Sequence, residues 1–116
     1  MSWFNPAGSR LRLSSFGDSR SFDYGEGLIE LDNGDLLVCG AKTATSTTHN
    51  DAWLLRVSSS GRIVWDASLG DSTGNEWMTT LCQLTSGKVA VAGHTLAAGA
   101  GKHDILLLLV DPNWQP

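Results

Sequence analysis

Basic residues are scarce in this 116-residue chain, which has 8 Lys and Arg against 12 Asp and Glu and a formal net charge of -4. That balance leaves no cationic surface to displace the counterions of a phosphate backbone, so it argues against a nucleic-acid partner. The longest apolar run, Ile105–Val110, is far shorter than the roughly 20 residues that span a bilayer. The N-terminus lacks the basic start and apolar stretch of a signal peptide. We therefore expect a cytoplasmic protein with no membrane partner.

Cysteine and known catalytic motifs are also sparse. Cys39 and Cys82 form no CxxC pair, and without a secretory signal we expect both thiols to be reduced and buried. There is no P-loop, dinucleotide fingerprint or serine nucleophile elbow. No window of 11 or more residues has a helical apolar period, whereas 13 glycines indicate many tight turns. These patterns predict an all-β protein, with no cofactor except for a divalent cation as an open alternative.

The chain repeats itself with a period of 53 residues, the distance from Phe16 to Leu69. Segment 16–19 aligns with 69–72, and segment 51–55 aligns with 104–108, in one register without a gap. Each repeat contains four short runs that are rich in β-branched and aromatic residues and bounded by turn residues. The eight predicted strands are Arg10–Phe16, Tyr24–Leu31, Asp35–Ala41, Ala52–Val57, Arg62–Leu69, Trp77–Leu84, Lys88–Thr95 and Ile105–Val110.

Four antiparallel strands that recur every 40–50 residues or so are typical of a propeller blade. Trp3-Phe4, two periods before Leu109-Val110, is expected to be the end of one more strand. We predict a single domain over 1–116, made of two tandem blade repeats at about 9–61 and 62–116.

Two stretches of the second repeat, 74–93 and 104–113, resemble the blades of bacterial β-propeller repeat proteins of the delta-60 type. They contain Gly-Asn-Glu-Trp, then Gln-Leu-Thr-Ser-Gly-Lys-Val-Ala-Val-Ala-Gly, and then Asp-Ile-Leu-Leu-Leu-Leu-Val-Asp-Pro-Asn. The first repeat matches the same pattern at 51–57, Asp-Ala-Trp-Leu-Leu-Arg-Val. The resemblance covers almost the whole chain and implies an architecture, not an activity. Trp114 departs from it where a glycine is expected, and Glu30 where the second repeat has Gln83.

Two blades cannot bury their own flanks, because strands such as Ile105–Val110 are apolar on both faces. We therefore expect a homo-oligomer, from dimer to tetramer, that closes a ring of four, six or eight blades. The strand Arg10–Phe16 of one copy is predicted to pair with Ile105–Val110 of the next and so to clasp the ring. Two alternatives stay open: a monomeric β-sandwich of two four-stranded sheets, and a piece of a longer propeller.

Long polar loops gather at one end of such a ring, where ligand sites usually lie. If Asp18, Asp23, Asp71 and Glu76 recur around the ring, they form an acidic collar for hard cations or cationic ligands. In the alternative, Asp18 and Asp71 only cap local turns. The loops are 17–23, 42–50, 70–76 and 96–103.

Histidines and one tryptophan complete the candidate site. His49 and His103 sit at matching loop ends and could bind a metal or act as general bases, as could His94. Trp77 could stack on a sugar or another planar ligand, although packing in a core or an interface is the simpler role for a tryptophan. Asp51 and Asp104 recur with the repeat and are expected to anchor the loops.

These observations favour a non-enzymatic binding or interaction scaffold, an oligomeric propeller whose ligand or partner site is on the long-loop face. The partners we expect are the chain itself and a small molecule or protein on that face. The alternative is an enzyme of the lyase or hydrolase type, with or without a metal ion. Its acid, its base or its metal ligands would then be Asp18, Asp71, Glu76 and the histidines, in the central funnel.

Overall fold

The structure, a computed structural model, describes residues 2–4, 6–7, 10–13, 15–17, 22–43, 49–70, 74–96 and 102–114. These residues form strands and turns, which confirms the predicted all-β class. They include no helix that is long and apolar enough to cross a membrane.

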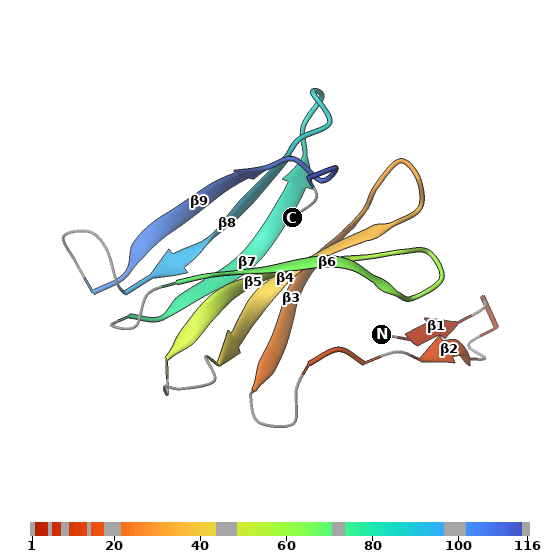
Figure 1. The fold of residues 1–116 in the computed structure, drawn as a ribbon, viewed down its shortest axis with the longest axis horizontal. Helices are drawn as coiled ribbons and strands as arrows, with labels where there is room; N and C mark the ends of the chain where they lie inside the picture. Colours follow the sequence, from red (N-terminus) through yellow and green to blue (C-terminus); the bar gives the residue numbers. More distant parts are fainter. Residues whose placement is uncertain are drawn as a thin grey trace.

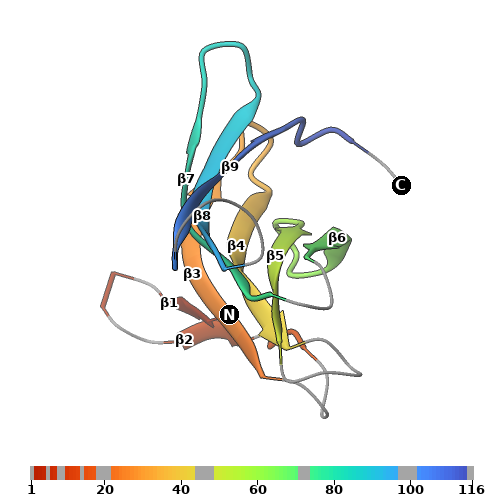
Figure 2. The ribbon, with the colours of Figure 1, turned by 90° about the vertical axis from the view of Figure 1, so that its left-hand side faces the viewer.

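The strands form two stacked antiparallel sheets and a separate hairpin (Figure 1). We call the four-stranded sheet, in the order β3-β4-β5-β6, the first sheet, and the three-stranded sheet, β7-β8-β9, the second sheet. The hairpin pairs β1 with β2 and lies away from the second sheet (Figures 1 and 2). The strand bounds are β1 Ser2–Phe4, β2 Arg10–Leu13, β3 Asp23–Glu30, β4 Leu36–Thr43, β5 Asn50–Val57, β6 Ile63–Leu69, β7 Glu76–Gln83, β8 Val89–Thr95 and β9 Asp104–Val110.

The eight predicted strands correspond to β2–β9, most of them to within two residues at either end. The largest difference is at β2, which ends at Leu13 and not at Phe16. Phe16 instead packs against the buried cluster of Trp53, Leu55 and Val57 on the first sheet. Phe16 is therefore not part of β2, and its side chain covers part of the first sheet.

The hydrogen-bond register repeats with the same period as the sequence. Phe4 pairs with Arg10 in the hairpin, and Val57 pairs with Ile63 in the first sheet, 53 residues later. The irregularities also recur, since both pairs sit at a register shift. The β3–β4 and β7–β8 pairs carry a second shared shift, between residues 25 and 27 and between residues 78 and 80. By this correspondence β2 relates to β1 as β6 relates to β5.

Three hairpin turns share one backbone geometry. In the β3–β4 turn, the Gly34 N–H donates to the Leu31 carbonyl, and Gly34 has a φ of 87°. Gly61 and Gly87 take up the same place in their turns, with φ values of 88° and 87°. A three-residue loop of this kind needs a left-handed residue at its end, which glycine adopts without steric cost.

The core lies between the two sheets. Their facing sides, which we call the inner faces, supply Leu37, Leu54 and Trp65 from the first sheet and Met78 and Val91 from the second. Strand β7 lies against β3, β4 and β5 of the first sheet, and Figure 2 shows the sheets as neighbouring layers. The stacking of the two repeats buries one face of each.

The two outer faces remain open to different degrees. We call the sides of the two sheets that point away from the core the first and second outer faces. The first outer face carries the buried cluster of Trp53, Leu55 and Val57, and Val38 and Phe16 pack against this cluster. The second outer face exposes Ile105, Leu107 and Leu109, which are 85%, 69% and 61% accessible. No fourth strand pairs with the free edge of β9 among the described residues.

The expectation that both thiols are buried is wrong for one of them. Cys39 is buried in the core, and that burial, together with the charge of Glu26, raises its pKa to about 11. Cys82 is exposed, because it pairs with Ala90 on the second outer face, which no described residue covers. Both thiols are free.

Candidate functional site

The predicted site residues gather at the end of the sheets opposite the three hairpin turns. Asp23 and Glu76 begin β3 and β7, while His49 and His103 immediately precede β5 and β9. Antiparallel pairing brings these strand ends to the same end of the sheets, as predicted. We call this end of the sheets the loop end. Asp18 and Asp71 lie outside the described residues.

Two carboxylates meet at the loop end between the sheets. Glu76 is 5% exposed and accepts a hydrogen bond from the Thr95 hydroxyl, with Oγ1 and Oε1 3.2 Å apart. Its other oxygen lies beside a carboxylate oxygen of Asp51, since a Cβ built on Gly70 would overlap both. The convergence of Glu76 and Asp51 on Gly70 was not predicted, since Asp51 is not a member of the expected collar.

The first repeat carries the same arrangement in part. A Cβ on Gly17, which corresponds to Gly70, would overlap a carboxylate oxygen of Asp23, which corresponds to Glu76. In both repeats the acid that begins the strand therefore has a carboxylate oxygen close to the glycine that follows the preceding strand. Asp104 corresponds to Asp51, and its Oδ2 is buried without a hydrogen-bond partner in the described part of the chain.

Trp77 and two histidines form an aromatic group beside these acids. Trp77 stacks on His94, with ring centroids 4.7 Å apart, and His94 meets His103 edge-on at 5.4 Å. Trp77 and Glu76 are successive strand residues and point to opposite faces of the second sheet. The structure thus joins Trp77 to His103 but separates both from Glu76.

That separation bears on the enzyme alternative. A general acid and base must be within hydrogen-bond reach of one substrate, and here a sheet lies between Glu76 and His94. His49 belongs to the first repeat and is half-buried. Within the described ranges, no three His, Cys, Asp or Glu side chains are grouped so as to hold a metal ion.

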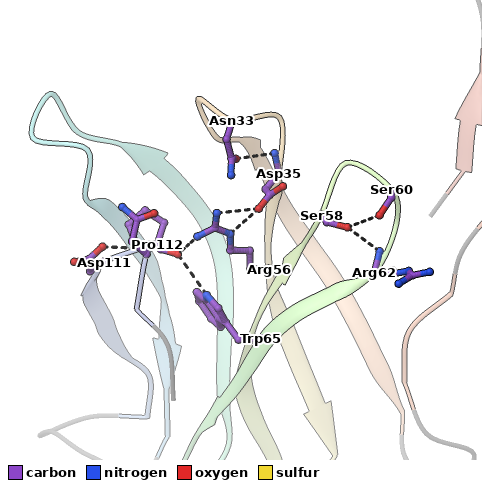
Figure 3. Close-up of polar contacts among 10 residues, drawn as sticks. Asn33, Asp35, Arg56, Ser58, Ser60, Arg62, Trp65, Asp111 and Pro112 are labelled. Carbon is purple, nitrogen blue, oxygen red and sulfur yellow. Dashed lines mark hydrogen bonds and ion pairs between the residues drawn. The ribbon is translucent and has the colours of Figure 1, made fainter.

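The opposite end of the sheets holds an ion pair that the sequence analysis missed (Figure 3). The Arg56 guanidinium lies 2.8 Å from the Asp35 carboxylate and also donates to the Pro112 carbonyl. Trp65 Nε1 donates to the same carbonyl at 3.4 Å, and its ring meets Trp114 edge-on at 5.7 Å. This network ties the segment after β9 to the first sheet. Trp114 therefore has a partner within its own chain.

Electrostatics explain why the pair is tolerated inside the protein. Burial by itself raises the pKa of the Asp35 carboxyl, but hydrogen bonds from Arg56 and Asn33 and the charge of Arg56 outweigh it, so this pKa lies below its ordinary value. The signal in the sequence is a break in the repeat. Asp35 and Arg56 correspond to Lys88 and Leu109, so two opposite charges are confined to one repeat.

A groove of about 400 Å³ opens on the first outer face. Its lining is mostly apolar and includes two acids, Asp23 and Glu26. Lys42 reaches over the Trp53 ring, with Nζ 5.5 Å from the ring centroid. The lining residues are Phe16, Asp23, Gly25, Glu26, Gly27, Leu28, Val38, Trp53 and Leu55.

No protein-family model matches the chain, and no curated protein matches it significantly. The resemblance to delta-60 propeller blades therefore remains a prediction from the sequence.

Proposed function

We propose that this chain is a non-enzymatic binding scaffold that assembles from copies of itself into a closed β-propeller and binds its ligand or partner at the loop end. The observation that carries the proposal is the relation between the two repeats. Leu54 lies in the core between the sheets, whereas Leu107, 53 residues later, is 69% exposed. The second sheet therefore presents to solvent the face that the first sheet buries.

The opposite faces show the same relation in reverse. Leu108 packs against the core from the second sheet, and its counterpart Leu55 lies on the first outer face. A second copy could thus cover one open face with the other, as the two sheets cover one another within the chain. Such a head-to-tail contact closes into a ring when its rotation allows. It would also cover the apolar row of Ile105, Leu107 and Leu109, which is exposed in the single chain.

The free edge of β9 fits the same assembly. By the repeat, β2 corresponds to the fourth strand of a sheet unit, and among the described residues of one chain it pairs only with Ser2–Phe4 of β1. Those residues, Ser2–Phe4, correspond to 108–110 at the end of β9. In the proposed ring, β9 of a neighbouring copy takes the place of β1 beside β2, which adds backbone hydrogen bonds along an otherwise open edge.

Binding at the loop end is supported by the side chains that meet there. The carboxylates of Asp51 and Glu76 both lie close to Gly70, and the Trp77–His103 group adds aromatic surface at the same end, on the other face of the second sheet. Repetition around a ring would multiply both features about one axis, which suits a cationic or planar ligand.

Light scattering coupled to size exclusion tests the assembly. We expect the wild-type chain to have two, three or four times the monomer mass. Leu107→Asp should give a folded monomer, because it places a charge in the covered face. Val64→Asp is the matched control, since Val64 is exposed on β6 and belongs to neither buried cluster. A folded, monomeric wild-type chain contradicts the proposal.

Thermal melting tests the loop end in the same preparation. Calcium or magnesium should raise the melting temperature if the acids hold a cation, and Asp23→Asn or Glu76→Gln should remove that shift. Chelator should reverse it. An absence of any shift excludes the cation and also counts against the metal-assisted enzyme alternative.

A further inference from the structure

Large and small side chains change places between the two repeats. Within the chain, Met78 of the second sheet is fully buried in the core cluster that includes Ala52 of the first sheet. The residue that corresponds to Met78 is Gly25, on the first outer face, and the residue that corresponds to Ala52 is Ile105, on the second outer face. The core between the two sheets, which we call the covered junction, thus combines Ala52 with Met78. The corresponding residues on the two outer faces are Ile105 and Gly25.

Nothing in the described part of the chain requires a glycine at position 25. Its φ is not in the left-handed region, and a Cβ there would meet only Val38 Cγ1, at an ordinary 3.7 Å. Gly27 is different, because a Cβ there would lie 2.9 Å from Cys39 Sγ and 3.3 Å from the Thr79 carbonyl oxygen of β7. The packing of the second sheet therefore requires Gly27, while Gly25 only leaves the floor of the groove empty.

Ile105 is equally unexplained as a residue of an isolated chain. It is 85% exposed and begins a row with Leu107 and Leu109 on one face of an edge strand. Exposed apolar edge strands are normally blunted with charge or proline, and this one is not. A partner that covers this row accounts for it.

We propose that Ile105 of one copy occupies the Gly25 groove of the next, so that the second outer face docks on the first outer face by the same geometry that stacks the two sheets within the chain. This inference rests on the proposed function and specifies its interface. Because isoleucine with glycine replaces alanine with methionine, the sum of side-chain sizes stays similar, as a close-packed junction demands. His94, which pairs with Ile105 across β8 and β9, then comes near the two acids that line the groove, Asp23 and Glu26.

A size-exchange experiment tests this contact. Gly25→Met fills the groove and should raise the apparent dissociation constant of the assembly at least tenfold. Ile105→Ala removes the occupant and should also weaken the assembly. The double variant G25M/I105A reproduces the pairing of the covered junction and should return to within about threefold of wild type, as mutually dependent residues do in a double-mutant cycle. Val64→Met, which adds a similar side chain outside the groove, should have no effect.

The outcomes separate this inference from the proposed function. If the wild-type chain assembles and Gly25→Met assembles equally well, the groove is not the interface, although the ring stands. If both single variants weaken assembly and the double variant does not recover, the two residues do not meet, and the inference fails. A monomeric wild type overturns both proposals. Ile105→Ala alters an exposed side chain and so keeps the test valid if Gly25→Met does not fold.

Discussion

Leu54 and Leu107 occupy the same position in the two repeats and have opposite surroundings. Both lie at the middle of the third strand of their sheet, and both are flanked by apolar residues. Leu54 is 4% exposed in the core, whereas Leu107 is 69% exposed. The difference comes from the neighbour alone, because the second sheet covers the inner face of the first and no described residue covers the outer face of the second. Burial in a stacked-sheet protein is therefore a property of the stack and not of the strand.

The largest difference is expected when each leucine is truncated. Leu54→Ala should cost about 2–5 kcal/mol of the free energy of unfolding, because it leaves a cavity in the core. Leu107→Ala should change the stability of a dilute, unassembled chain by no more than about 0.5 kcal/mol. Urea unfolding, measured below the concentration of assembly, compares the two. Equal losses would mean that the second outer face is already covered within one chain.

The second expected difference between the repeats concerns the Asp35–Arg56 ion pair, whose residues correspond to Lys88 and Leu109 in the second repeat. Arg56→Leu gives the first repeat the residue of the second and should cost about 3 kcal/mol, since it leaves a partly buried Asp35 carboxylate without its cation. The double variant D35N/R56L should lose less, because no charge is then stranded. Denaturant midpoints of the two variants measure the difference. A double variant that is less stable than Arg56→Leu would show that the charge of Asp35 is not the source of the loss.

The strands and their repetition could be predicted from the sequence, because alternation, turn glycines and the 53-residue period are local signals. The pairing of Phe4 with Arg10 in the register of Val57 with Ile63 follows from that period. What lies beside each face is a non-local property. Cys82 was therefore expected to be buried, since an apolar strand does not reveal which of its faces its own chain covers.

The candidate site divides in the same way. Its place at the loop end follows from strand order, so Glu76 and His103 could be assigned to one edge. Whether the sheet separates them depends on which of Glu76 and Trp77 points toward the core. The β-bulge between Met78 and Thr80 shifts the alternation of side chains along β7, so the sequence pattern does not show which of the two residues points inward. The Arg56 network was missed in part because one of its two acceptors, the Pro112 carbonyl, is a backbone group.

Acid should weaken the first repeat through Asp35, with a smaller effect than loss of the pair. The pKa of this carboxyl is lowered in the folded chain, so its contribution to stability is fully present above the unfolded value of 3.8. It is lost as the pH falls below 3.8 through the lower folded pKa. Urea midpoints between about pH 5 and pH 2 should therefore fall more steeply for the wild type than for Asp35→Asn. Parallel profiles would rule out a depressed pKa at this site.

Glycine substitutions should give the smallest effects and compare the repeats at equal backbone geometry. Gly34→Ala and Gly87→Ala should each cost about 1–2 kcal/mol, and by similar amounts, since both residues have a φ of 87° in matching turns. Gly25→Ala should behave in the opposite way. Its backbone accepts a side chain, so alanine should stabilise the unassembled chain by about 0.4–1 kcal/mol through the lower entropy of its unfolded state. A loss of stability at Gly25 in the dilute chain would mean that its backbone needs glycine after all, and the empty groove would then be a by-product of the strand rather than a space kept for Ile105.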